Sequence, residues 1–203
     1  PAAGSGVREH AWLAARDTRF ARALDLTGPL PLRREADGFA ALWSSIVSQQ
    51  VSVASANAIW ARLERAGMTD PVALGQAGDD ALRALGLSRQ KARYGRALAL
   101  AAIDYTALRD QPNEAVITTL TQVPGIGRWT AEVYAMFALG RADVFAPGDL
   151  ALQEAARLLF DLPERPNERA IRMMAEDWAP WRAVAARLLW AYYHVAKNRE
   201  GIR

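Results

Sequence analysis

Apolar residues recur at spacings of three and four along most of the chain, which is the pattern of helices that bury one face. Runs of β-branched residues and strict apolar–polar alternation, which would indicate strands, are few. The pattern therefore predicts an all-α protein. The predicted helices cover residues 7–24, 38–50, 52–66, 71–76, 79–85, 89–108, 112–122, 128–139, 149–160, 167–177 and 181–196.

Polar residues lie where several of these helices begin or meet. Asp37 and Ser88 each precede a predicted helix, and both residue types accept hydrogen bonds from first-turn amides. Gln49 and Gln50 lie where two apolar helices meet. Amide side chains in such a place cap a helix, bond to the backbone or project outward, and the first two roles are favoured here.

The predicted helix 89–108 opens with basic residues, and no acid lies between Ala81 and Ile103. The turn before it, at Gly86, resembles a second, weaker helix-turn-helix joint. A basic run of this kind is either a solvated helix face or a strip that faces DNA, and the sequence favours neither. The basic residues are Arg89, Lys91, Arg93 and Arg96.

The sharpest predicted turn lies between the helices 112–122 and 128–139. Pro124 comes before Gly125 and Gly127, which flank one apolar residue, and glycine adopts positive φ at little cost. Such a turn can leave one helix and open the next, whose first N–H groups then bind an anion such as a phosphate. A plain connection between helices is the alternative. No predicted strand precedes the turn, which argues against a dinucleotide-binding unit.

One acidic residue, Asp149, lies downstream of this turn at the head of a predicted helix, after Pro147 and Gly148. Helix capping is the commoner role of an aspartate in this position. A catalytic role is compatible with capping, because the helix dipole and the first amides favour the ionised form. An ionised carboxylate can stabilise an oxocarbenium-like transition state at a sugar carbon.

The chain has seven tryptophans. Trp12, Trp43 and Trp60 fall on apolar helix faces and are predicted to be core residues. Trp129 follows the glycine turn directly, and Trp181 belongs to an aromatic cluster near the C-terminus. Aromatic faces stack on displaced bases and attract cationic rings, so these two are candidates for a base pocket.

Composition narrows the class of protein. The formal net charge is +3 and arginines outnumber lysines, which suits phosphate contacts. The chain has no cysteine and two histidines, which excludes disulfides and cysteine-ligated clusters and argues against a histidine-rich metal site. Neither a membrane-spanning stretch nor a secretory signal is evident. We expect a flexible lead over residues 1–6 and a cytoplasmic protein, nucleoid-associated if bacterial.

These stretches together resemble the helix-hairpin-helix DNA glycosylases, and among them the alkylbase branch, the DNA-3-methyladenine glycosylase II proteins. Residues 120–131 look like the helix-hairpin-helix motif, and residues 145–149 look like the segment with the catalytic aspartate. The strings at 125–131, 180–182 and 46–52 also fit this branch. The similarity extends over about residues 37–195, and the combination is far more specific than any one piece.

The resemblance implies one two-lobed helical unit over residues 1–203, with a cleft between the lobes and the hairpin at about 113–139. Asp149 would be the catalytic aspartate, and Gln50 would fill the gap left by a flipped nucleotide. Trp129 and Trp181 would line the base pocket. The implied phosphate-binding residues are Gly125, Gly127, Arg128 and Thr130, and the implied ligands of a structural Na⁺ or K⁺ are the backbone carbonyls of Gln122, Val123 and Ile126.

The resemblance also implies the reaction. Trp129 stands where glycosylase/lyase relatives carry a nucleophilic lysine, so no Schiff base can form there. We therefore expect a monomeric, monofunctional enzyme of base excision repair that flips alkylated purines of the 3-methyladenine type out of duplex DNA and excises them. No cofactor beyond the cation, and no iron–sulfur cluster, is expected. The alternatives are a bifunctional glycosylase/lyase for oxidised bases, a non-catalytic DNA-binding module and a helical protein–protein adaptor.

Two departures from the branch concern the pocket and the N-terminus. Val133 lies where some relatives have a pocket tyrosine, and the neighbouring Tyr134 would point elsewhere on a helix. Full-length members often carry an additional N-terminal α/β domain, for which the segment before residue 37 is too short. The departure at position 133 bears on the range of substrates and not on the fold or the chemistry.

Overall fold

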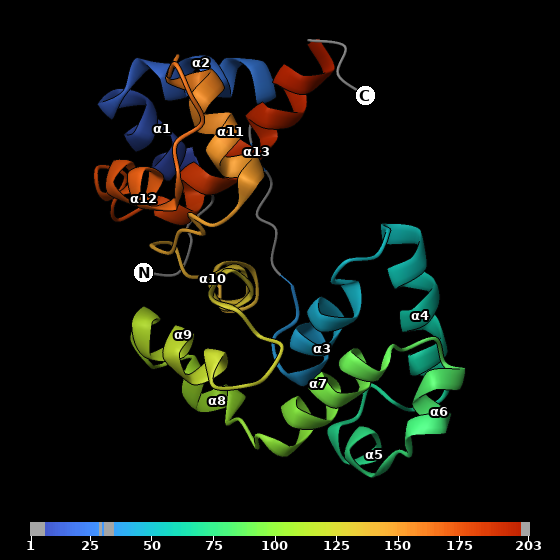
Figure 1. Cartoon of the computed structure of the whole chain (residues 1–203). Helices are drawn as coiled ribbons and strands as arrows, with labels where there is room; N and C mark the ends of the chain where they lie inside the picture. Colours follow the sequence, from blue (N-terminus) through green and yellow to red (C-terminus); the bar gives the residue numbers. More distant parts are fainter. Residues whose placement is uncertain (1–6, 29, 31–34, 200–203) are drawn as a thin grey trace. The chain divides into compact units, whose positions relative to one another are not determined.

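The computed structural model of the chain describes residues 7–28, 30 and 35–199, and the expected flexible lead lies outside them. Helices and turns make up this part of the chain, and it contains no strand (Figure 1). The predicted all-α class is confirmed. Among the described residues, no helix is both long and apolar enough to cross a membrane.

The chain divides into two compact units, and the division falls within one helix, α10. The central unit comprises Glu35–Tyr134, and the terminal unit comprises Pro1–Arg34 and Ala135–Arg203. The helices of the central unit are α3 (Phe39–Ser48), α4 (Val53–Arg65), α5 (Pro71–Gln76), α6 (Asp79–Ala84), α7 (Arg89–Leu100), α8 (Tyr105–Leu108), α9 (Asn113–Thr121) and most of α10 (Arg128–Phe137). Those of the terminal unit are α1 (Val7–Arg16), α2 (Thr18–Thr27), α11 (Leu150–Leu159), α12 (Glu168–Glu176) and α13 (Arg182–Arg199).

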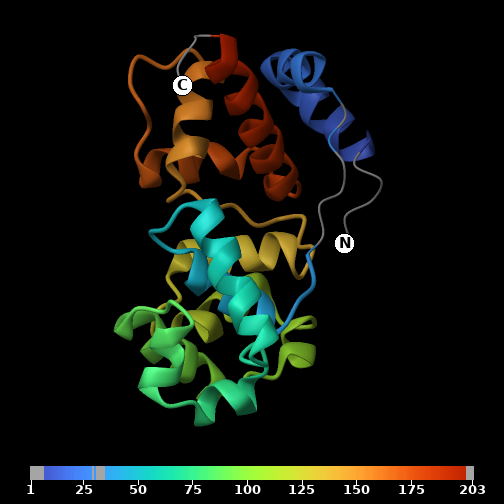
Figure 2. The same ribbon diagram turned by 90° about the vertical axis from the view of Figure 1, so that its right-hand side faces the viewer.

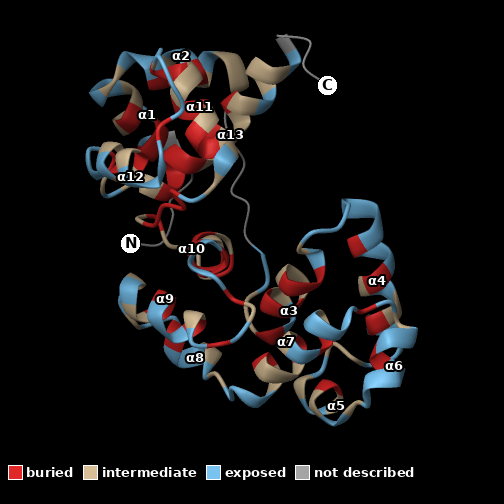
Figure 3. Ribbon diagram, in the orientation of Figure 1, coloured by how far each residue is buried: buried red, intermediate tan, exposed pale blue. Residues whose placement is uncertain are grey.

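The core of the central unit forms where α7 packs against α3. Leu42, Trp43 and Ile46 of α3 are fully buried, and the Trp43 indole donates to the Met68 carbonyl (3.1 Å). Gly95 of α7 permits this packing, because a Cβ there would lie 2.6 Å from the Trp43 ring. The buried positions lie on the helix sides that face other helices (Figure 3).

The terminal unit has an aromatic core beneath α2 and the end of α11. The Phe20 ring meets the Trp178 ring edge-on at 5.5 Å, and the Phe160 ring stacks on Trp178 at 5.7 Å. Such pairs stabilise a core beyond their buried area. Helix α13 packs against α11 and α2, and it holds these elements together (Figure 2).

Two of the predicted helices have the wrong extent, because each corresponds to two separate helices in the structure. The 7–24 prediction breaks at Asp17, whose carboxylate accepts from the Arg19 amide (2.9 Å) and caps α2. The 89–108 prediction ends at Leu100, and Asp104 caps α8 by accepting from the Ala107 amide (2.9 Å). In both cases the apolar spacing continues across the break, so periodicity alone does not reveal it.

The prediction that Asp37 caps α3 is wrong, whereas Ser88 does cap α7. Gly38 occupies the N-cap of α3. Asp37 instead forms a two-pronged ion pair with Arg109, with N–O distances of 2.7 and 2.9 Å, which ties the end of α8 to the start of α3. Ser88 accepts from the Lys91 amide at 3.2 Å, as predicted.

Candidate DNA-binding and catalytic site

The hairpin between α9 and α10 requires glycine at position 125. Gly125 has φ of 95°, and a Cβ there would lie 2.5 Å from atoms of the Tyr94 ring. Its carbonyl accepts a hydrogen bond from the Gln49 side chain (2.9 Å). The expectation that a glutamine bonds to backbone here is confirmed for Gln49, and this bond joins the end of α3 to the hairpin.

Gly127 has a different reason to be glycine. Its φ is not positive, and a Cβ there would meet nothing within 4 Å. The residue immediately precedes α10, and its carbonyl accepts from the Ala131 amide (3.1 Å). With no side chain at this position, nothing in Gly127 can cap the first amides of α10, which have no partner within the helix. This geometry suits the predicted phosphate site.

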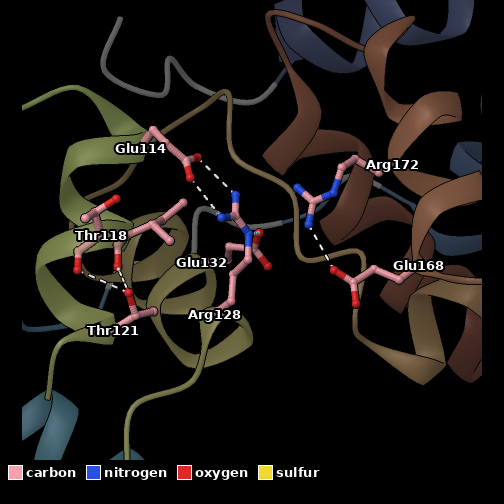
Figure 4. Close-up of polar contacts among 8 residues, drawn as sticks. Glu114, Thr118, Thr121, Arg128, Glu132, Glu168 and Arg172 are labelled. Carbon is pink, nitrogen blue, oxygen red and sulfur yellow. Dashed lines mark hydrogen bonds and ion pairs between the residues drawn. The ribbon is translucent and has the colours of Figure 1, made fainter. Parts of the chain in front are cut away.

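Arg128, the first residue of α10, is held by two carboxylates. Its guanidinium makes a two-pronged pair with Glu114 of α9 (2.8 and 3.0 Å) and a third bond to Glu132 (3.0 Å), as Figure 4 shows. The Glu114 hydrogen bonds are the main reason that the Arg128 pKa is raised. Glu132 is only 2% exposed, so this pairing also compensates a buried charge. Arg128 thus ties α9 to α10, and its contact with phosphate stays a prediction.

The remaining polar contacts of Figure 4 stay within single helices or their ends. The Thr121 hydroxyl donates to the carbonyls of Ile117 and Thr118, and therefore closes the C-terminal end of α9. Arg172 and Glu168 pair along α12 in the terminal unit. These bonds stabilise the ends and faces of their own helices.

The backbone of the turn also bears on the predicted cation site. No cluster of three or more His, Cys, Asp or Glu side chains that could hold a metal occurs in the described ranges. The Val123 carbonyl accepts from the Ile126 amide (3.0 Å), and a carbonyl oxygen has a second lone pair for a cation. Carbonyl oxygens of this kind are hard donors and fit Na⁺ or K⁺.

A cavity of about 800 Å³ lies within the central unit, between α3, α4 and α10. The cavity is lined by Trp129, Thr130 and Val133 of α10, and residue Trp129 is 45% exposed. Trp60 of α4 lines it as well, so the prediction that Trp60 is a core residue is wrong. Its indole donates to Glu64 (2.9 Å), which fixes the ring. The full lining is Glu35, Ala36, Ala40, Ala41, Ser44, Ser45, Ser48, Gln49, Gln50, Trp60, Trp129, Thr130 and Val133.

Two neighbouring residues on α10 point to different places, as predicted. Val133 lines the cavity together with Trp129, four residues earlier. Tyr134 is buried, and its hydroxyl accepts from the Gly38 amide (2.9 Å). Burial is the main cause of the raised pKa of Tyr134. The phenol therefore supports the start of α3 and does not replace a pocket tyrosine.

Gln50, the predicted DNA wedge, is exposed and has a strained backbone. Its φ is 55°, a left-handed conformation that a non-glycine residue adopts at a cost. The residue directly follows Gln49, which is anchored to the hairpin, and both line the cavity. A side chain held outward in this way is suited to enter a DNA stack, and its role there stays a prediction.

In the terminal unit, Asp149 caps α11 and has a tryptophan partner. Its Oδ1 accepts from the Leu152 amide (3.0 Å) and from the Trp190 indole (3.2 Å). The Trp190 ring also lies 5.7 Å from the Phe137 ring. The sequence does not connect Trp190 to Asp149, because no local spacing reveals a contact between residues of different helices.

A second buried bond fixes the loop before Asp149. Gln153 is 6% exposed, and its amide donates to the Pro147 carbonyl (2.8 Å). Since Gln153 lies on the first turn of α11, this bond holds the loop against the helix that it enters. The carboxylate is therefore positioned from both its own helix and the preceding loop.

Trp181 precedes α13 in the terminal unit and is half-buried. The next residue, Arg182, makes a two-pronged pair with Asp143 (2.6 and 2.8 Å), which raises the Arg182 pKa and fixes the start of α13. Trp129 belongs to the central unit. That Trp129 and Trp181 share one pocket, in a cleft between lobes, therefore stays a prediction.

The family model that describes the HhH-GPD superfamily base excision DNA repair proteins matches residues 43–181. The chain belongs to this family. It is similar to DNA-3-methyladenine glycosylase 1 of Schizosaccharomyces pombe, with 29% identity over 94% of this chain and 89% of the relative.

Solved structures agree with this assignment. A crystal structure of DNA-3-methyladenine glycosidase from Bacillus halodurans aligns with a TM-score of 0.83 and 35% identity, over 91% of this chain and 88% of that one. The Schizosaccharomyces pombe 3-methyladenine DNA glycosylase Mag1 in complex with abasic DNA aligns with a TM-score of 0.78 and 29% identity, over 91% and 95% of the two chains. The expected family and helical glycosylase fold are confirmed.

Proposed function

We propose that the chain is a monofunctional DNA glycosylase that hydrolyses the N-glycosidic bond of alkylated purines, of the 3-methyladenine type, in duplex DNA. The observation that carries the proposal is the position of the Asp149 carboxylate. It heads α11, receives two N–H donors on Oδ1, and follows a loop that a buried glutamine holds in place. The chain belongs to a base excision repair family, and its relatives named above are 3-methyladenine glycosylases.

The proposed reaction needs little acid catalysis. A purine alkylated at N3 or N7 is already cationic, so it departs as a neutral base when the bond to the sugar breaks and the electron pair goes to its nitrogen. The sugar is left as an oxocarbenium-like cation, which the Asp149 carboxylate stabilises. Water then attacks the sugar carbon and loses a proton.

The proposed base site uses the cavity of the central unit. Trp129 and Trp60 present aromatic rings to it, and a cationic purine is attracted to such rings more strongly than a neutral one. Val133 leaves more room than a tyrosine would. The displaced base enters, in this proposal, while Gln50 fills the gap in the duplex, and Trp181 is a further candidate for stacking on the base.

The hairpin is the proposed site of DNA backbone binding. The first amides of α10 after Gly127 hold a phosphate, with Thr130 and Arg128 beside them, and the carbonyls of Gln122, Val123 and Ile126 hold Na⁺ or K⁺. The protein acts as a monomer on DNA, in the cytoplasm or at the nucleoid of a bacterial cell. Because Trp129 replaces the lysine of lyases, no covalent bond to the sugar forms at that position.

The test is release of bases from methylated duplex DNA by the whole chain. We expect free 3-methyladenine or 7-methylguanine, abasic sites that break only after alkali, and no protein–DNA adduct after borohydride. An adduct with borohydride would establish a lyase. Binding to DNA without release of any base would reduce the protein to a DNA-binding module, and neither binding nor release would favour an adaptor.

A further inference from the structure

The basic residues at the start of α7 separate into two groups that sequence could not distinguish. Lys91 turns inward, where its ammonium donates to the Val47 carbonyl (2.6 Å), and burial lowers its pKa. Arg89, Arg93 and Arg96 lie on the other side and line one hollow of about 690 Å³. We call these three residues the α7 arginine stripe.

The α7 arginine stripe carries an excess of positive charge. Arg96 pairs with Asp79, which also lines the hollow. Arg89 and Arg93 are exposed, and no ion pair joins either of them to an acid within the described part of the chain. Two exposed arginines therefore line a concave surface whose one lining carboxylate, that of Asp79, is paired with Arg96. Such a surface attracts a polyanion.

The stripe begins beside the hairpin, in the same unit. Tyr94 connects them, because its ring lies against Gly125 while the Arg93 guanidinium carbon lies 5.5 Å from the centre of that ring. Gln90, which also lines the hollow, donates to the Tyr94 hydroxyl (2.7 Å). A strand whose phosphate is held at Gly127 carries its next phosphates about 3.4 Å apart along the axis, so they come within reach of arginine side chains on α7.

We propose that the α7 arginine stripe is a second phosphate-contact surface, which binds the backbone of the same duplex beyond the hairpin site. This inference rests on the proposed function, because it needs DNA at the hairpin. Arg93 and Arg89 contact successive phosphates, and Tyr94 and Gln90 hold Arg93 in place. The contacts carry no base information. They lengthen the footprint on undamaged duplex beside the lesion.

The test measures how DNA affinity depends on salt. The probe is a duplex with a tetrahydrofuran abasic-site analogue, which a glycosylase cannot cleave. We compare the wild-type chain with Arg89→Ala/Arg93→Ala, the lysine pair Arg89→Lys/Arg93→Lys, and a charge-matched control, Arg65→Ala/Arg169→Ala, which removes two exposed arginines from α4 and α12. Thermal melting checks that each variant is folded.

Loss of two phosphate contacts should reduce the slope of log Kd against log salt by about 1.8, since each contact contributes about 0.9. The lysine pair should keep most of the slope, and the control should keep all of it. We also shorten the duplex in stages, in one series on one side of the abasic site and in a second series on the other side. In one series only, the salt slope of the wild-type chain should fall to the slope of the alanine pair. This outcome would show that the stripe binds the same DNA.

An alanine pair with the slope of the control overturns the inference, whether or not the enzyme releases bases. A wild-type chain that binds the probe but releases no base contradicts the proposed function, while the slopes still decide the role of the stripe. A wild-type chain that does not bind the probe contradicts both.

Discussion

The central unit contains two helix-turn-helix joints that have the same kind of glycine turn but differ at the start of the second helix. The hairpin joint links α9 to α10 through Gly125, and the second joint links α6 to α7 through Gly86. These glycines have φ of 95° and 96°. A side chain satisfies a carbonyl at each turn, since Gln49 donates to Gly125 (2.9 Å) and Arg62 donates to Leu85 (2.8 Å).

The residue before the second helix is a capping serine in one joint and a glycine in the other. In the second joint, the Ser88 hydroxyl accepts from a first-turn amide of α7 and closes the helix end. In the hairpin joint, the equivalent place before α10 is Gly127, with no side chain and open space around it. The second joint therefore caps its helix with a side chain, whereas the hairpin places at the same position a residue that has none, and we propose that a DNA phosphate binds there. In our account, the second joint contributes arginine side chains to DNA binding, whereas the hairpin contributes backbone amides.

The largest expected effect comes from closing the hairpin joint. Gly127→Asp places a capping carboxylate before α10, where it satisfies the first amides and repels phosphate. We expect affinity for the abasic-analogue duplex to fall about 100-fold, or about 2.8 kcal/mol. Gly127→Ser, which copies Ser88, should cause a smaller loss. Folding stability should be unchanged or higher by a few tenths of a kcal/mol. Unchanged affinity in both variants would remove the distinction between the joints.

The next effect tests why the turns need glycine. Gly125→Ala adds left-handed strain and a clash with the Tyr94 ring, so we expect a loss of about 2 kcal/mol or more in the free energy of unfolding. At Gly86 the atom in the way is the far end of the Arg62 side chain, which can move. Gly86→Ala should therefore cost only about 1 kcal/mol. Denaturant titration measures both, and the reverse order would show that the Tyr94 contact is not restrictive.

A smaller effect is expected from opening the second joint. Ser88→Ala removes the cap of α7 and should destabilise the protein by about 1 kcal/mol. Affinity for DNA should stay within about twofold of wild type, because the proposed contacts of α7 are arginine side chains. Denaturant titration and binding on the same preparation separate the two quantities. A gain in affinity would mean that the exposed helix end at Ser88 also binds phosphate.

The smallest effect concerns the cation. Replacing K⁺ by tetramethylammonium at constant ionic strength should weaken DNA binding by wild type, since the proposed carbonyl ligands prefer a small hard ion. The loss of DNA affinity on cation exchange should be smaller than the loss caused by Gly127→Ser. The affinity of Gly127→Asp should change less than that of the wild type, because in this variant the phosphate site is already closed. An equal response of wild type and Gly127→Asp would place the cation effect elsewhere, such as on the DNA.

Local sequence predicted the turns and missed the contacts that cross between helices. The hairpin, the cap at Ser88 and the head of α11 follow from glycine and capping chemistry, which act over a few residues. The bond from Trp190 to Asp149 joins residues of different helices and left no local signal. The break at Asp17 was hidden because apolar residues keep their helical spacing on both sides of it.

The sequence also did not reveal which residues of the same type are buried. Trp60 and Trp43 both fall on apolar helix faces, yet Trp43 is fully buried and Trp60 lines a cavity. Lys91 and Arg93 are two positions apart, and α7 directs the first inward and the second to solvent. The packing of α7 against α3 buries Trp43 against Gly95 and directs Lys91 toward the Val47 carbonyl, and Trp60 lies on α4, outside this contact.

We propose that the Asp149 carboxylate stabilises the sugar cation during excision of an alkylated purine. The most direct measurement is the single-turnover rate of 3-methyladenine release from methylated duplex DNA by Asp149→Asn. The control is Asp70→Asn, which alters another N-cap aspartate, in α5. Asparagine also caps helices, so both variants should fold and bind the abasic-analogue duplex. We predict a loss of at least about 100-fold for Asp149→Asn and none for Asp70→Asn. Equal rates for Asp149→Asn and wild type would contradict the account.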